Sequence, residues 1–126
     1  MDEVELLVNR ILAAREEKRQ IFFFGNGGSA AIASHIVTDL AKDRFEDENA
    51  LFRVQSLNDN VSWFSATAND FGYEKVFVSQ LKNLLQPEDL VIAISSSGNS
   101  PNVVKAIEFA NQKGAETWGI VGFDSG

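Results

Sequence analysis

Two short apolar runs constrain what this chain can fold into more than any other feature. The first spans Gln20 to Phe24 and ends at Gly25; the second spans Leu90 to Ile94 and ends at Ser95. Unbroken apolar runs of this length are typical of strands buried on both faces, as the strands of parallel sheets are. Each run is followed by a loop and then by a helical pattern, which predicts strand–loop–helix units around one parallel sheet.

The remaining segments alternate between helix and strand in the same way. We therefore predict one domain, residues 1–126, of the α/β class: a three-layer α/β/α sandwich around a parallel sheet, doubly wound as in flavodoxin-like folds. The expected helices span residues 3–18, 29–42, 60–68, 73–85 and 101–114, and the expected strands 20–24, 53–57, 90–94 and 117–121. Residues 122–126 are expected to form a loop. Because a domain of this type should continue into another helix, we expect the sequence to lack its C-terminal elements.

Apolar spacing and capping residues give these helices an expected orientation. The first helix has an inward stripe of apolar residues at helical spacing, namely Val4, Leu7, Ile11 and Ala14. In the helix expected over 73–85, Val76 and Phe77 are among the residues that should face the core. Ser100 is placed to cap the last helix, which begins with Pro101.

Charge and composition exclude several classes of function. The net charge of −7 disfavours nucleic acid and anionic membrane surfaces as partners, since both attract clustered lysine and arginine. No segment approaches the roughly 18 consecutive apolar residues of a membrane span. The absence of cysteine excludes disulfides and thiolate chemistry and fits a reducing cytoplasm, where we expect the protein to reside. His35 is the single histidine, so a mechanism that needs two must take the other from elsewhere.

The loop Ser95-Ser96-Ser97-Gly98-Asn99-Ser100 is the first candidate site. It joins a buried strand to a helix N-terminus, so backbone N–H groups, four hydroxyls and the positive end of the helix dipole converge there. A phosphate can be held this way without side-chain cations. The pattern predicts phosphate binding, and the alternative is an ordinary solvated polar turn.

The loop Gly25-Asn26-Gly27-Gly28-Ser29-Ala30 follows the other buried strand. It matches the loose dinucleotide fingerprint G-x-G-x-x-A, which would indicate a nicotinamide cofactor. The acidic residue expected about 20 residues later is missing, since Asp59 comes 29 residues after Ala30. A nucleotide-dependent oxidoreductase would also leave the serine-rich loop unused. A third interpretation is a tight turn that needs glycine for conformational reasons alone.

Three stretches, 25–31, 68–74 and 94–103, together resemble the sugar isomerase (SIS) family, and within it the phosphoheptose isomerases. The resemblance runs from about Gln20 to Gly126 in the family's order. It implies a domain that binds a phosphosugar at the carboxyl ends of a parallel sheet and assembles as a homodimer or homotetramer with shared sites. The heptose branch converts sedoheptulose 7-phosphate to D-glycero-D-manno-heptose 7-phosphate, so an aldose–ketose isomerase acting through a cis-enediol is expected.

The resemblance also implies roles for individual residues. Substrate and phosphate would be bound by side chains and backbone of the two loops and of the segment between them, at Asn26, Gly27, Ser29, Asp70, Ser95, Ser96, Ser97 and Ser100. Ser96 stands where a threonine is usual. His35 and Asp39 lie where the isomerases carry a histidine and a glutamate, the latter the proposed catalytic base.

His35 and Asp39 are four residues apart, so they share one face of the expected helix. A carboxylate base works best when burial raises its pKa toward neutrality, which predicts a dry pocket for Asp39. Some members of the family bind zinc at this pair, so both are candidate zinc ligands, although no cofactor is required by the expected chemistry. Two ligands are too few for a structural zinc site. Asp39 is one methylene shorter than the family glutamate.

Other departures from the family keep a second function open. The basic residue that should follow the pair is represented by Lys42 and Arg44, and the second catalytic histidine and a ligand glutamine are absent from this sequence. The alternative to an isomerase is therefore a non-catalytic phosphosugar sensor or protein-binding adaptor on the same fold.

Overall fold

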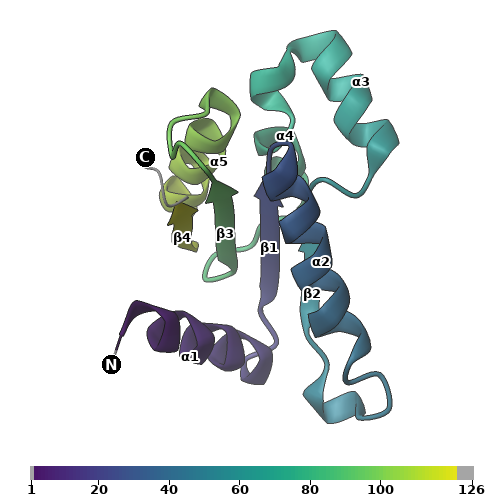
Figure 1. The fold of residues 1–126 in the computed structure, drawn as a ribbon, viewed down its shortest axis with the longest axis vertical. Helices are drawn as coiled ribbons and strands as arrows, with labels where there is room; N and C mark the ends of the chain where they lie inside the picture. The colour runs from purple at the N-terminus through teal and green to yellow at the C-terminus, as the bar shows by residue number, and fades with distance from the viewer. Residues whose placement is uncertain (1, 122–126) are drawn as a thin grey trace.

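The computed structural model describes residues 2–121, and within them four parallel strands form one sheet in the order β2-β1-β3-β4. The strands are β1 (Gln20–Gly25), β2 (Arg53–Ser56), β3 (Leu90–Ser95) and β4 (Glu116–Val121). All of their carboxyl ends lie at the same edge of the sheet, which is the upper edge in Figure 1. The predicted α/β class and the flavodoxin-like strand order are confirmed.

Helices cover both faces of the sheet. The helices are α1 (Glu3–Glu16), α2 (Gly28–Lys42), α3 (Val61–Phe71), α4 (Val78–Leu84) and α5 (Pro101–Gln112), with short 3-10 turns η1 (Glu48–Ala50) and η2 (Tyr73–Lys75). Buried residues of α1 and α2 pack on one face, and those of α4 and α5 pack on the other. The three layers predicted from the sequence are therefore present. None of the described helices is long and apolar enough to cross a membrane.

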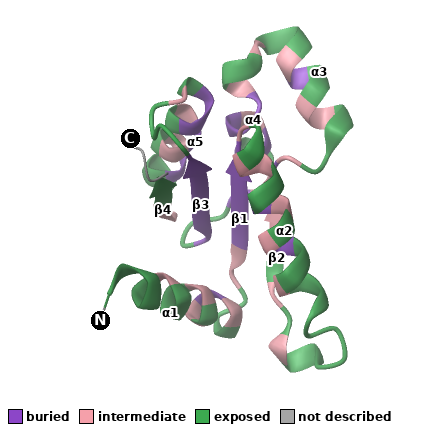
Figure 2. Cartoon of the chain, in the orientation of Figure 1, coloured by how far each residue is buried: buried purple, intermediate pink, exposed green. Residues whose placement is uncertain are grey.

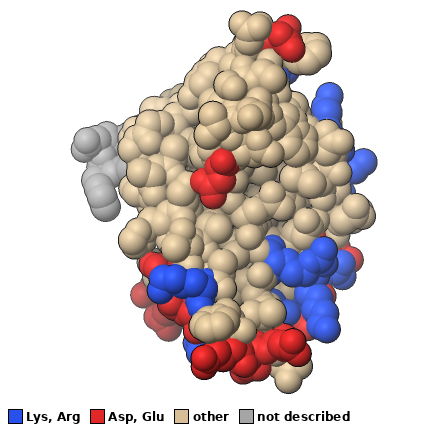
Figure 3. Space-filling model, turned by 90° about the vertical axis from the view of Figure 1, so that its right-hand side faces the viewer, with Lys and Arg blue, Asp and Glu red and all other residues tan. Residues whose placement is uncertain are grey.

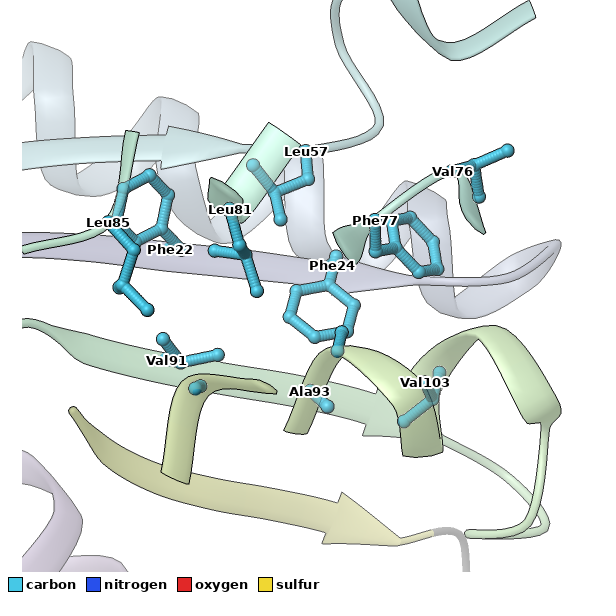
Figure 4. Packing of buried hydrophobic residues seen from close by; sticks show 12 residues of the cluster. Phe22, Phe24, Leu57, Val76, Phe77, Leu81, Leu85, Val91, Ala93 and Val103 are labelled. Carbon is cyan, nitrogen blue, oxygen red and sulfur yellow. The ribbon is translucent and has the colours of Figure 1, made fainter. Parts of the chain in front are cut away.

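The strand β1 is the centre of the core. Phe22 and Phe24 point to the face covered by α4 and α5, and Ile21 and Phe23 to the opposite face. These four side chains are at most 1% exposed, and Figure 2 shows β1 and β3 as the most completely buried elements. Figure 4 shows the ring of Phe24 against that of Phe77, with 4.6 Å between ring centroids. Full burial of each of these side chains stabilises the fold by roughly 1.5–3 kcal/mol.

The helix expected over residues 73–85 is wrong in its first half. Tyr73–Lys75 is a 3-10 turn, and the α-helix begins only at Val78. The aromatic residues at the two ends of segment 73–77 have different partners. Phe77 packs on Phe24 in the core, while the Tyr73 hydroxyl donates a hydrogen bond to Asn26. Tertiary contacts therefore override the local helical preference.

Two further expectations are corrected. The helix α3 runs three residues beyond Ala68, because it ends only at Gly72, whose φ of 106° is costly for other residues. In α1 the apolar stripe is shorter than predicted: Leu7, Ile11 and Ala14 pack on the core, but Val4 is 72% exposed.

An ion pair joins α1 to the edge strand β4. The Arg10 guanidinium lies 2.9 Å from the Glu116 carboxylate, and the Trp118 indole N–H donates to the same carboxylate at 2.8 Å. Burial alone would raise the pKa of Glu116, but the hydrogen bonds from Arg10 and Trp118 outweigh it and hold that pKa below its usual value. The pair therefore helps to fix α1 on the sheet.

Replacing Glu116 tests this attachment. Glu116→Gln is expected to lower the free energy of unfolding by about 0.5–1 kcal/mol at neutral pH, the range for partly exposed ion pairs. Because the folded pKa lies below the ordinary value of 4.5, the contribution is complete above that value and is lost as the pH falls through the folded pKa. Urea denaturation at neutral and acid pH measures it. A difference between the two proteins that persists in acid would contradict the assignment.

Candidate functional site

The strand order reverses direction between β1 and β3, since β2 lies beyond β1 and β4 lies beyond β3. In doubly wound sheets, ligands bind at the carboxyl ends of the strands beside this point. Gly25 at the end of β1 pairs with Ile94 of β3, so the loops that follow the two strands leave the sheet side by side. Both candidate loops of the sequence therefore meet at the expected position.

Gly25 is required by the close approach of these strands. A Cβ atom at this position would lie 2.5 Å from the carbonyl oxygen of Ile94 and 2.7 Å from the Cβ of Ser29. Asn58, just after β2, then holds the Gly25 backbone: its amide nitrogen donates to the Gly25 carbonyl at 2.8 Å, and its oxygen accepts from the Gly25 N–H at 3.0 Å. The carboxyl ends of three strands are thus fixed together.

A side-chain network joins the two loops. Asn26 and Asn102 exchange two amide hydrogen bonds of 3.0 and 2.9 Å, and the Tyr73 hydroxyl donates to the Asn26 oxygen at 2.8 Å. Asn102, in the first turn of α5, is 2% exposed. No role was predicted from the sequence for Asn58, Tyr73 or Asn102. The sequence offered one signal for each asparagine: Asn58 comes just after a predicted strand, and Asn102 stands at the start of a predicted helix.

The two helices that begin at this point lack side-chain caps. Asp2 accepts a hydrogen bond from the first turn of α1, and Asn60 does so for α3. In contrast, Gly27 and Ser100 precede α2 and α5 and provide no side-chain cap. The expected Ser100 cap is therefore not formed, although the residue is at the predicted position. No side chain caps the first-turn N–H groups of either helix, although those of Ser29 and Ala30 in α2 donate to the Asn26 and Gly27 carbonyls. Two uncapped helix N-termini in one place suit an anion.

The serine-rich loop is held by its own hydroxyls. Ser95 Oγ accepts from the Gly98 N–H at 2.9 Å, and Ser97 Oγ accepts from the Asn99 N–H at 3.1 Å. Each hydroxyl keeps its hydrogen for donation to a ligand. Ser95 is buried, whereas Ser96 and Ser97 are exposed, and Gly98 adopts a φ of 75° that permits the turn.

A hollow of about 460 Å³ opens between the two loops and η2. Its lining residues are Asn26, Tyr73, Glu74, Ser100, Pro101 and Asn102. No lysine or arginine is among them, so within the described chain an anion here would rely on N–H groups and hydroxyls. On the face drawn in Figure 3, most charged side chains lie in the lower half, away from the end where the strands terminate.

His35 and Asp39 lie together but apart from the loops. His35 Nε2 is 3.3 Å from Asp39 Oδ2, as their spacing predicted, yet the two side chains are 78% and 51% exposed. They occupy the face of α2 opposite Ala33 and Val37, which pack on the sheet. The dry pocket expected for Asp39 is therefore not formed by this chain on its own.

His35 and Asp39 are also separated along α2 from the two candidate loops. Asp39 lies ten residues after Ser29, so the two are about 15 Å apart along the helix axis at 1.5 Å per residue. A phosphosugar of seven carbons measures less than about 10 Å from its reacting carbon to phosphorus, taking bonds of about 1.5 Å. A phosphosugar anchored near Ser29 would therefore have to lie extended along α2 to reach Asp39 of the same chain.

Of the other predicted site residues, Gly27 and Ser29 lie at the loops and Asp70 lies apart from them. Gly27 and Ser29 lie at the start of α2, and Ser29 is close to the contact between Gly25 and the end of β3. Asp70 is exposed near the end of α3, where its carboxylate accepts from the Asn69 amide at 3.2 Å, and it does not line the hollow.

Metal ligands do not gather in the described part of the chain. Residues 2–121 contain no group of three or more histidine, aspartate or glutamate side chains that could hold an ion. His35 and Asp39 offer two donors, whereas zinc sites use three or four protein ligands. This donor set does not fit zinc without ligands from outside residues 2–121.

The contact at Gly25 yields a test of the site's framework. Gly25→Ala should lower the free energy of unfolding by about 1–3 kcal/mol, because the new methyl group forces β1 away from β3 and α2. Gly119→Ala, on β4, is the matched control, since its added Cβ would meet no atom within 4 Å. Urea denaturation of both variants measures the difference. Equal stabilities would show that the close approach is not needed.

Comparison with known proteins places this arrangement in a family. Residues 1–122 match the SIS domain. Phosphoheptose isomerases of Trichlorobacter lovleyi and Nitratidesulfovibrio vulgaris are each 40% identical to this chain over 95% and 99% of its length. The chain spans 61% and 60% of those relatives, about three fifths of their length.

Solved structures agree with this assignment. The phosphoheptose isomerase of Francisella tularensis superposes with a TM-score of 0.89 at 25% identity, over 98% of this chain and 64% of that one. For the enzyme of Neisseria gonorrhoeae the TM-score is 0.77 at 29% identity, over 98% and 67% of the two chains. The chain belongs to the SIS domain family.

Proposed function

We propose that this chain is a phosphosugar isomerase domain that interconverts sedoheptulose 7-phosphate and D-glycero-D-manno-heptose 7-phosphate. The observation that carries the proposal is the meeting of two helix N-termini without side-chain caps, those of α2 and α5, at the switch point of the sheet. The relatives named phosphoheptose isomerase support the choice of substrate.

The phosphate would anchor at the loop Ser95–Ser100 and at Ser29. Its oxygens would accept from backbone N–H groups at the starts of α2 and α5 and from the serine hydroxyls. Binding energy from this remote group would then position the reacting carbons, as in other enzymes that act on phosphorylated substrates. Asn26, which lines the hollow, would contact the sugar.

The reaction itself needs a base and an acid. Asp39 would remove the proton from the carbon next to the carbonyl while an acid protonates the carbonyl oxygen, which gives a cis-enediol. Return of the proton to the neighbouring carbon, with loss of the other hydroxyl proton, completes the isomerisation. His35, 3.3 Å from Asp39, is the one imidazole of this chain, and the resemblance assigns the acid to a histidine outside this sequence.

A second copy of the chain would complete the site. Asp39 is half exposed on the solvent side of α2, so a partner subunit packed on this side of the helix would cover it. We propose a homodimer or homotetramer in which each site takes residues from two chains. Burial of the pair by the partner would also exclude water from the enediol.

Location and cofactors follow from the same proposal. The absence of cysteine and the metabolic substrate favour the cytoplasm. The chemistry above uses side chains alone, and the two donors at His35 and Asp39 would hold zinc only with additional ligands from outside the described residues.

The exposure of His35 and Asp39 favours one alternative function. A phosphosugar sensor or protein-binding adaptor would use the anchoring loops but would not need a buried base. The two functions differ in whether proton transfer depends on Asp39.

Replacement of Asp39 separates the two functions. Asp39→Asn should lower the isomerisation rate about 10²–10⁴-fold, the usual contribution of a general base, while sedoheptulose 7-phosphate binding changes little. The measurement is hydrogen exchange in heavy water at the carbon next to the carbonyl, with a panel of ketose phosphates. Wild-type protein that binds these sugars without exchanging any of them would be a sensor.

Replacement of Ser97 tests the anchoring loop. Ser97→Ala removes one hydroxyl donor to the phosphate and should weaken sedoheptulose 7-phosphate binding about tenfold. Titration calorimetry measures this, with NADH as a second ligand. Saturable NADH binding that is indifferent to Ser97 would instead favour a nicotinamide-dependent oxidoreductase.

A further inference from the structure

The hydrogen bonds of the Asn26 side-chain amide leave only a donor, one N–H group, available to a ligand. The Asn26 oxygen accepts from Asn102 at 2.9 Å and from the Tyr73 hydroxyl at 2.8 Å, which occupies both of its lone pairs. The Asn26 nitrogen donates one hydrogen to Asn102 at 3.0 Å. The second N–H has no partner in this network, and Asn26 lines the hollow beside Ser100.

We infer that Asn102 is a positioning residue, which fixes the Asn26 amide so that Asn26 can only donate a hydrogen bond to the bound phosphosugar. This inference rests on the proposed function, because it concerns the same ligand. A donor is the useful group here, since phosphate, carbonyl and hydroxyl oxygens can all accept from it.

Asn102 sets the orientation more strongly than Tyr73 does. If Asn26 alone rotated by half a turn, nitrogen would face nitrogen and oxygen would face oxygen, and both bonds to Asn102 would be lost. A hydroxyl, in contrast, can donate or accept, so Tyr73 tolerates either orientation. Joint rotation of both amides would have to turn Asn102 within a site where it is only 2% exposed.

The same pair joins the two anchoring loops. Asn26 follows β1 and Asn102 belongs to the first turn of α5, 76 residues later. A partly buried, reciprocal pair of hydrogen bonds between the two amides therefore ties the start of α5 to the loop before α2. Loss of Asn102 should release the Asn26 amide even if the fold persists.

Side-chain NMR tests the orientation in the free protein. In the ¹⁵N-labelled full chain, the Asn26 Nδ2 protons are identified by their absence in Asn26→Asp. One proton should exchange slowly with solvent and the other rapidly, and Asn102→Leu should abolish the difference. Equal exchange of the two protons in wild type would overturn the inference, whatever ligand the protein binds.

A double-mutant cycle tests the route through Asn26. Asn26→Ala and Asn102→Leu should each weaken sedoheptulose 7-phosphate binding about tenfold, and the double variant should be no weaker than Asn26→Ala alone. Wild-type affinity in Asn102→Leu, or a loss of about a hundredfold in the double variant, would overturn it. If the Asn102→Leu protein does not fold, Asn102→Ala replaces it in the cycle.

The control is Asn83→Leu, on the exposed surface of α4, which should bind with unchanged affinity. Absence of sedoheptulose 7-phosphate binding by wild-type protein would count against the proposed function. The exchange measurement on the free chain would still decide the inference.

Discussion

The contact between β1 and β3 at their carboxyl ends is the constraint on which the rest of the structure depends. Gly25 lies so close to the Ile94 carbonyl that no side chain fits between the two strands. Asn58 then closes the same point from the side of β2. Because the strands end together, their two loops and the helices after them must start together. The candidate site is therefore a direct consequence of how tightly these strands pack.

An acidic chain can hold an anion at this point because backbone groups provide the positive potential. The net charge is −7, and no lysine or arginine of the described chain lines the hollow between the loops. The helices α2 and α5 instead begin without side-chain caps, unlike α1 and α3. The N-termini of these two helices, with the positive ends of their dipoles, would attract an anion without a nearby lysine or arginine. The proposed site would thus accept a small anion without attracting nucleic acid.

Anchoring and chemistry are separated on this chain. The loops that would hold phosphate lie at the edge of the sheet, whereas His35 and Asp39 lie on the solvent side of α2. In the proposed homo-oligomer, a neighbouring copy would cover the exposed pair and bring it to a bound sugar. It also explains how the same fold could keep its ligand and lose its catalysis.

The sequence by itself determined the layers, the buried strands and the two loops, because unbroken apolar runs and glycine- or serine-rich turns depend on local chemistry. It also predicted that His35 and Asp39 share a helix face. Only the tertiary structure decided how far α3 extends, where the helix after Tyr73 begins, and that Asn102 lies against Asn26. Those outcomes depend on contacts between residues far apart in the chain, such as Phe77 with Phe24, which have no periodic signal. The exposure of Asp39 likewise depends on what packs around α2, and no local pattern encodes that.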